Sequence, residues 1–165
     1  MNLKFKEAKI FKDTSNKLTI VNYNPNTDDY FNFIAEQCNK RQLNQVILTS
    51  DIMIILIFSL VEKYKFCLER VEFMNDDDTL DAEINHLVDI SMDNKENFIF
   101  LLHKLQLLSY EQSIDILKIH LKKRYEHKSA QIKIQANGIF FIDKSNFDKY
   151  SQKILDIVSY SKVYY

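Results

Sequence analysis

Metal ligands and nucleophiles are the first residues to consider in this chain, which has four histidines and two cysteines. Zinc sites use these ligands at short, repeated spacings. The sequence contains no CxxC, HExxH or HxH pattern, and its histidines never recur at i and i+4. Neither Cys38 nor Cys67 has a histidine nearby in the sequence that could act as its base. The sequence therefore predicts neither a metal site nor a catalytic cysteine, and it indicates no cofactor.

Two tripeptides have the acid-x-lysine form that metal-dependent nucleases use. They are EAK at residues 7–9 and DNK at residues 93–95. Such a site also needs an upstream aspartate on a preceding strand, and neither tripeptide has one. Because tripeptides this short recur by chance, we interpret neither as a nuclease site. We expect that the protein is not an enzyme.

Gly138 is the only glycine in the chain. Walker-A loops, dinucleotide-binding fingerprints, kinase phosphate loops and nucleophile elbows each need at least two closely spaced glycines, because their backbone approaches phosphate or makes a strained turn. The sequence therefore excludes the enzyme classes that depend on these motifs.

An acidic segment begins at residue 76. Its candidate partner-binding residues are Asp76, Asp77, Asp78, Asp81 and Glu83. The spacing does not match an EF-hand loop, which needs alternate ligands, a glycine at its turn and a distal glutamate. The helix dipole favours carboxylates at a helix N-terminus, and this explains the segment without a ligand. The alternative is that these carboxylates meet a basic partner.

A basic stretch, KIHLKKRYEHK at residues 118–128, is the main candidate for contact with a polyanion. The candidate nucleic-acid-binding residues are Lys118, Lys122, Lys123, Arg124, Lys128 and Lys133. Basic residues also suit the last turn of a helix, and the acidic segment can neutralise them within the fold. Both interpretations stay open at the level of sequence.

The first half of the chain predicts a mixture of strands and helices. Residues 3–12 and 17–23 alternate and predict a hairpin, and Thr27 is the expected N-cap of a short helix. The apolar stripe of this helix consists of Tyr30, Phe31, Ile34 and Cys38. A short strand in QVILTSD then turns at Ser50 into a buried helix, and residues 66–74 predict another strand. This strand–helix–strand order favours a βαβ unit with parallel pairing.

The second half predicts helices followed by a hairpin. Two helices are expected from residue 76 to 108, and the capping-box spacing of SYEQ at Ser109 predicts a third that runs to Arg124. Asn137 and Gly138 then form the centre of a two-residue type I′ hairpin turn, which needs a positive φ at both positions. Ser145 is the expected cap of a last helix. The inward residues of that helix are Phe147, Tyr150, Ile154 and Ile157.

These elements predict an α+β fold. We expect a small mixed sheet from short N-terminal and C-terminal hairpins, with a helix-dominated C-terminal half. The length of 165 residues suits one domain over 1–165, with a soft subdivision near residue 75. Residues 1–75 are expected to be mixed α/β, and residues 76–165 to be helical with a β-hairpin at 131–142.

Composition adds a location and a class of partner. A hydrophobic fraction of 46% argues against disorder, and a net charge of −1 provides no general attraction to nucleic acid or lipid. The chain starts without an apolar signal sequence, and the apolar run at residues 51–61 is shorter than the ~18 residues a membrane span needs. Reduced structural thiols in the cytoplasm are favoured over a single disulfide. The abundance of lysine, asparagine and isoleucine is typical of an AT-rich genome, such as that of a low-GC bacterium, a phage or a large virus.

Two hypotheses for function follow. The first is a non-catalytic cytosolic module that binds another protein and inhibits it by occlusion, as an immunity protein or a mobile-element or viral antagonist does. Tyrosine-rich surfaces and segregated acidic patches are typical of such interfaces. The alternative is a DNA-binding regulator or replication accessory, because three helices followed by a hairpin form the element order of a winged helix. Glu111 and Asp115 on the outward face of its third helix oppose that alternative.

Overall fold

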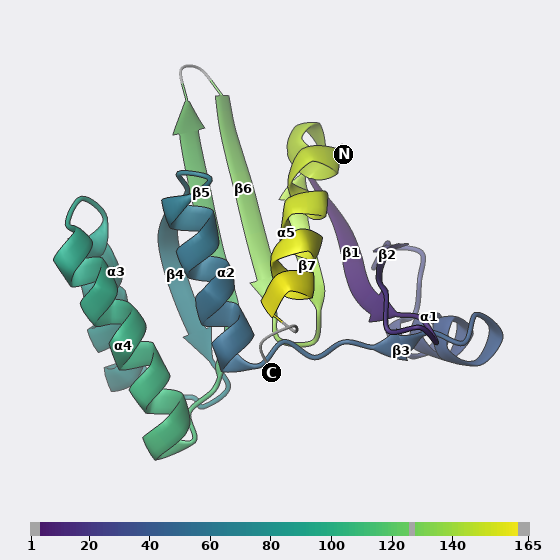
Figure 1. Cartoon of the computed structure of the whole chain (residues 1–165), viewed down its shortest axis with the longest axis horizontal. Coiled ribbons are helices and arrows are strands. Elements are labelled where there is room, and N and C mark those ends of the chain that lie inside the picture. The colour runs from purple at the N-terminus through teal and green to yellow at the C-terminus, as the bar shows by residue number, and fades with distance from the viewer. Residues whose placement is uncertain (1–3, 126–127, 162–165) are drawn as a thin grey trace.

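An antiparallel sheet forms the centre of this computed structural model, which describes residues 4–125 and 128–161 (Figure 1). Within those residues six strands follow one another in the order β2-β1-β7-β6-β5-β4, and the short β3 also pairs with β1. The strands are β1 (Phe5–Lys12), β2 (Leu18–Tyr23), β3 (Asn44–Gln45), β4 (Cys67–Phe73), β5 (Ile116–Tyr125), β6 (Lys128–Gln135) and β7 (Ile139–Asp143). The first strand of the chain therefore pairs with its last, in the middle of the sheet.

Five α-helices accompany the sheet in the described part of the chain. They are α1 (Tyr30–Ala35), α2 (Ser50–Glu62), α3 (Asp78–Ser91), α4 (Lys95–Gln112) and α5 (Phe147–Ser161). A π-helical turn, η1 (Glu36–Lys40), extends α1, and a 3-10 turn, η2 (Lys144–Asn146), precedes α5. In Figure 1, α2 and α5 lie on one face of the sheet, and α3 and α4 lie beside β4 and α2. The fold is α+β with a helix-rich C-terminal half, which confirms the predicted class.

The predicted hairpins are confirmed, but the predicted βαβ unit is wrong. β1 and β2 form the N-terminal hairpin, of which Leu3 lies outside the described residues. The strand predicted at 66–74 is β4, and it pairs antiparallel with β5. The segment expected as a parallel partner forms only the two-residue β3 before the chain continues to α2. All the pairings among the described strands are antiparallel.

The predicted third helix is also wrong, because residues 116–125 form β5. Helix α4 runs past Ser109 to Gln112, and Ser113 then ends it in the left-handed conformation with φ 55°. The Ser109 hydroxyl donates to the Asp115 carboxylate at 2.9 Å and caps no helix. Pairing with β6 from Lys118 to Tyr125 makes the extended conformation the stable one.

The predicted cap of the first helix is replaced by a neighbouring aspartate, and the predicted cap Ser145 lies inside η2. Asp29, not Thr27, caps α1, since its carboxylate accepts from the Asn32 N–H at 3.0 Å. Phe33 is the buried aromatic of this helix, whereas Phe31 is 79% exposed. Before α5, the buried Asp143 carboxylate accepts from the hydroxyl of Ser145 and the amide of Asn146. The four residues predicted to face inward from α5 are buried.

The hydrophobic core lies between one face of the sheet and the helices. Side chains alternate along each strand, so that Ala8, Ile10, Phe140 and Ile142 face the core from the two central strands. From α5 the fully buried Tyr150 packs edge-on against Phe66, with ring centroids 4.9 Å apart. A second, smaller cluster of Phe11, Phe33 and Leu43 lies where α1 and η1 cover part of the other face. One core thus includes residues from both halves of the chain, and the predicted single-domain organisation stays a prediction.

The only glycine of the chain lies where three segments meet. The β6–β7 turn contains Ala136, Asn137 and Gly138, and the Gly138 N–H closes it by donating to the Gln135 carbonyl at 3.0 Å. Gly138 has φ +83°, and Asn137 is not among the residues with positive φ. The turn is therefore a three-residue loop rather than the predicted type I′ turn, and it needs one left-handed residue instead of two. A Cβ on Gly138 would lie 2.6 Å from the Val46 carbonyl oxygen.

Gly138→Ala should destabilise the protein by at least about 2 kcal/mol, because alanine is strained at positive φ and its Cβ meets backbone. Asn137→Ala is the matched control: it removes only the 3.1 Å bond from the Ile139 N–H to the Asn137 side chain, which contributes about 1 kcal/mol. Urea denaturation of the two variants measures the difference. Equal stability of Gly138→Ala and the wild type would refute this role for the glycine.

Candidate functional site

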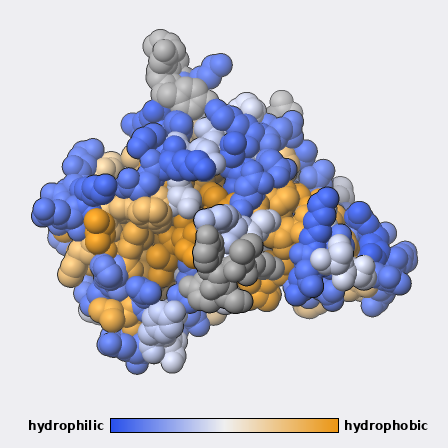
Figure 2. Space-filling model, viewed as in Figure 1, coloured by the Kyte–Doolittle hydropathy of each residue, from blue (hydrophilic) through white to orange (hydrophobic). Residues whose placement is uncertain are grey.

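An apolar groove runs between α2 and α4. Ile54, Ile55 and Phe58 line it from α2, and Ile99 and Leu102 line it from α4, around a volume of about 250 Å³. Phe58 is 49% exposed and Ile99 is 44% exposed. The surface between these helices is largely hydrophobic in Figure 2. The sequence predicted α2 as a buried helix, and Phe58 departs from that prediction.

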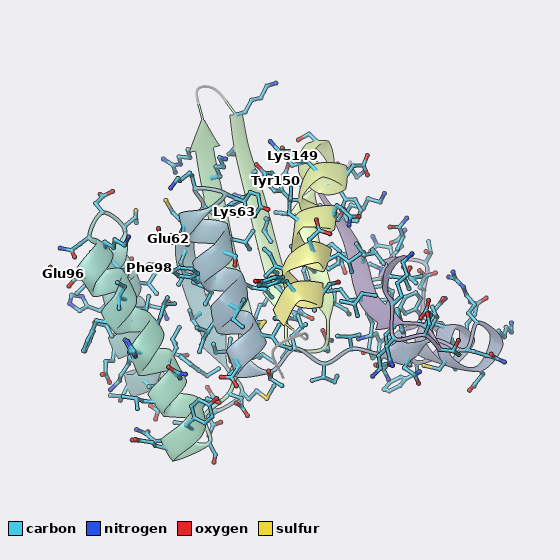
Figure 3. All side chains as sticks on the ribbon, viewed as in Figure 1. Glu62, Lys63, Glu96, Phe98, Lys149 and Tyr150 are labelled. Atoms are coloured by element: carbon cyan, nitrogen blue, oxygen red, sulfur yellow. The ribbon has the colours of Figure 1, made fainter. Side chains whose placement is uncertain are left out.

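The two helices that form the α2–α4 groove run in opposite directions. Glu62 at the end of α2 and Glu96 near the start of α4 therefore lie at the same end of the pair, and the buried Phe98 lies between the helices (Figure 3). At the opposite end, the Tyr110 hydroxyl donates to the Asp51 carboxylate at 2.9 Å. Asp51 and His103 line the groove itself. The groove is thus apolar along its length and carries carboxylates at both ends.

The predicted acidic segment begins beside the Asp51 end of the groove. The Met74 N–H donates to the Asp115 carbonyl at 2.9 Å, and the Asp115 carboxylate accepts from Ser50, the first residue of α2. Asp76 follows Met74 by two residues. Asp51, Asp115 and the start of the acidic segment therefore gather at this end, which we call the acidic end.

The residues of the acidic segment have different roles in α3. Asp77 is the N-cap and accepts from the Thr79 and Leu80 N–H groups, each at 3.0 Å. Asp76 and Asp78 are exposed beside it. Asp81 is half-buried, and Glu83 forms an ion pair with Lys104 of α4 at 3.2 Å. The first three aspartates therefore lie together at the start of α3, whereas Glu83 faces α4.

The face of the sheet opposite the core carries aromatic and charged side chains, and we call it the open sheet face. No helix of the described chain packs over it along β5, β6 and the outer part of β7. One row of directly paired residues crosses all six strands. From β2 to β4 the row consists of Tyr23, Glu7, Phe141, Lys133, His120 and Arg70. The Glu72 carboxylate and the His120 ring nitrogen Nε2 form a hydrogen bond of 2.6 Å, and this bond lowers the pKa of the Glu72 carboxyl.

Strand alternation divides the predicted basic residues between the two faces of the sheet. Lys118, Lys122 and Arg124 share a side of β5 with His120, and Lys133 lies on the same face of β6. These residues therefore belong to the open sheet face, although they were predicted on a helix.

The other two predicted basic residues lie elsewhere. The Lys123 ammonium donates to the Tyr64 carbonyl at 2.8 Å, on the helix-covered side. Lys128 begins β6, in phase with the buried Ala130. Residues 126 and 127 of the basic stretch lie outside the described residues.

A pocket of about 520 Å³ opens on the β1–β2–β7 side of the open sheet face. Phe5, Tyr23 and Phe141 supply aromatic walls, and Glu7 lies among them. Burial raises the pKa of the Glu7 carboxyl, while the nearby Lys118 acts in the opposite direction. These aromatics are not among the residues predicted to bind a partner. Phe5 and Phe141 come from opposite ends of the chain, and they become neighbours only when β1 pairs with β7.

The EAK tripeptide lies on this face, and its lysine is buried. Glu7 and Lys9 share a side of β1, and Lys9 is fully buried with its ammonium donating to the Asn137 carbonyl. Burial lowers the pKa of Lys9 from 10.5 to about 8. In DNK, Asn94 caps α4, and Lys95 is its exposed first residue. Among the described residues, no three His, Cys, Asp or Glu side chains are grouped closely enough to hold a metal ion.

The two cysteines are free, and they differ in exposure. Cys38 is half-buried beside the small Phe11 cluster. Cys67 is exposed on the edge strand β4.

Lys9 should make stability rise with pH. In the unfolded chain it titrates near 10.5, so that between pH 8 and 10.5 the unfolded state holds a proton that the folded state has released. The free energy of unfolding then increases with pH through this window. Lys9→Met should lack this increase. Urea denaturation of both proteins at pH 7, 8, 9 and 10 measures it, and parallel curves for the two proteins would contradict the role of Lys9.

Helices of the described chain are all too short or too polar to cross a membrane. No protein-family model, curated protein or solved structure matches the chain.

Proposed function

We propose that this protein is a non-catalytic module that binds another protein through the α2–α4 groove. The observation that carries the proposal is the exposure of Phe58 and Ile99 in a groove between two antiparallel helices. Such a groove suits an amphipathic helix, whose apolar side chains recur along one face. We propose an amphipathic helix of the partner as the occupant.

The composition of α2 supports this occupant. Residues 52–58 are seven consecutive apolar side chains, so the helix is apolar on every side. A helix of this kind is normally covered all round. The core covers one side, whereas the Phe58 side faces the groove. Covering two half-exposed apolar side chains of this size contributes on the order of 1 kcal/mol each.

Charge supports a basic residue at one end of the bound helix. The acidic end combines Asp51, Asp115 and the aspartates that precede α3. Complementary charge speeds encounter and selects the orientation in which a partner docks. In this proposal the acidic segment is the charged part of a larger binding surface, and the α2–α4 groove is its apolar part.

Occlusion is the consequence that we propose for the partner. A helix held in the groove is unavailable for its own contacts, which is how an immunity protein or a viral or mobile-element antagonist inhibits. We also propose that the protein is cytosolic, because free cysteines are favoured in that compartment and both cysteines are free. The winged-helix alternative has no comparable support, since its recognition helix is the strand β5.

The groove is tested with the double variant Phe58→Ser/Ile99→Ser. Leu107→Ser is the matched control, because Leu107 is an apolar residue of α4 that is 48% exposed and does not line the groove. We expect the wild type and Leu107→Ser to capture a partner from the native host. The double variant should bind the purified partner at least about tenfold more weakly. Capture is followed by calorimetry on the purified pair. Equal affinity of the folded double variant and the wild type would overturn the proposal.

The acidic end is tested by changing Asp76, Asp77 and Asp78 to asparagine together. Association with the same partner should slow, and its dependence on salt should weaken, because steering by charge is lost. Thermal stability should change little, since asparagine also caps a helix at position 77. Stopped-flow association at two salt concentrations measures the effect. Unchanged rates at both concentrations would exclude this contact.

A further inference from the structure

The aromatic residues of the open sheet face are arranged to receive a flat ring. Tyr23 and Phe141 are the direct neighbours of Glu7 on either side, two strand spacings or about 9.6 Å apart. Phe5 lies diagonally to Phe141 on the adjacent strand, since its own direct partner is Asp143. Together the three rings line the 520 Å³ pocket, a volume in the range of small-molecule sites.

Lysine ammonium groups lie over two of these rings. The Lys133 ammonium is 5.1 Å from the centre of the Phe5 ring, and the Lys118 ammonium is 5.0 Å from that of Phe141. A base stacked on either ring would take the place of the ammonium over it, and its phosphate would then lie within reach of the displaced lysine. Lys122 and Arg124 continue the cations along β5, away from the pocket.

Charge on the open sheet face is biased toward the positive. Its cations are Arg70, Lys118, Lys122, Arg124 and Lys133. Its accessible carboxylates are Glu7, Glu69 and Glu72, and the pocket is also lined by Asp28, Lys4 and Lys144. The chain as a whole has a net charge of −1, so the rest of the chain is net negative. The carboxylate of Glu7 lies in the pocket and not along β5 and β6. In the pocket it can accept a hydrogen bond from the amino group of a base.

We propose that the open sheet face binds single-stranded nucleic acid. Bases stack on Phe5, Phe141 and Tyr23, and phosphates lie along the cations of β5 and β6. Exposed aromatics on a sheet bind unpaired bases because every base has a flat apolar face, whereas the bases of a duplex are stacked inside it. The six strands span about 24 Å, which is enough for a short single-stranded segment. This surface is on the opposite side of the sheet from α2, so it is independent of the α2–α4 groove.

Fluorescence anisotropy with labelled 12-nucleotide DNA and RNA of mixed sequence, and with the DNA duplex of the same sequence, tests the proposal. We expect binding of the single strands that weakens as salt is raised, and at least about tenfold weaker binding of the duplex. Lys118→Gln/Lys133→Gln should flatten the plot of log affinity against log salt by about 0.7 per lost phosphate contact. Lys63→Gln/Lys95→Gln is the matched control and should leave the plot unchanged, because it changes an exposed lysine just after α2 and another at the start of α4.

Stacking is tested separately with Phe5→Leu and Phe141→Leu, which keep an apolar side chain on the sheet. Each should weaken binding of the single strands by about tenfold or more. Circular dichroism establishes that the variants are folded, and Phe58→Ser/Ile99→Ser should bind the oligonucleotides as the wild type does. Absence of single-strand binding at 50 mM salt would overturn the proposal. Equal binding of the duplex, or wild-type affinity in both leucine variants, would overturn it as well.

Discussion

The docking of the β6–β7 turn against the rest of the sheet is the constraint on which this structure depends. The Gly138 carbonyl accepts from the Ile10 N–H of β1 at 3.0 Å, and the Ala136 carbonyl accepts from the Leu48 N–H at 2.8 Å. The buried Lys9 ammonium donates to the carbonyl of Asn137 between them. Because a side chain at position 138 would collide with the Val46 carbonyl, only glycine allows the three segments to approach this closely.

This constraint determines the two surfaces of the molecule. With β1 held beside β7, the chain from β3 crosses the end of the sheet and delivers α2 to one face, where α4 packs against it. The opposite face is left to Phe5, Phe141 and the lysines of β5 and β6. An apolar groove with an acidic end and an aromatic, basic sheet face therefore lie on opposite sides. The two proposed activities need no shared residue, so neither proposal excludes the other.

Local patterns predicted much of the fold, and non-local pairing explains what they missed. One hydrophobic period dominates in each of the correctly predicted elements, which are the N-terminal hairpin, β4, α3 and α5. Residues 114–125 are ambiguous: Ile114, Leu117 and Leu121 have a helical spacing, but residues 116–125 also fit a strand. Pairing with β6 decides between them, and no local signal contains that partner. The same limit applies to the surfaces. The acidic segment could be predicted because its aspartates are consecutive in the sequence. The groove could not, because it combines Phe58 and Ile99 from separate helices, and the aromatic pocket combines residues from opposite ends of the chain.

Native-state hydrogen exchange at the amides of Ile10, Leu48 and Ala136 tests the central constraint most directly. The first two donate to the β6–β7 turn, and the third donates from it to the Leu117 carbonyl at 2.8 Å. If the docked turn holds the sheet together, these amides open only when the whole protein unfolds, and their protection equals the free energy of unfolding measured with urea. Exchange through local opening, with protection several kcal/mol below that of the core strands, would contradict the account.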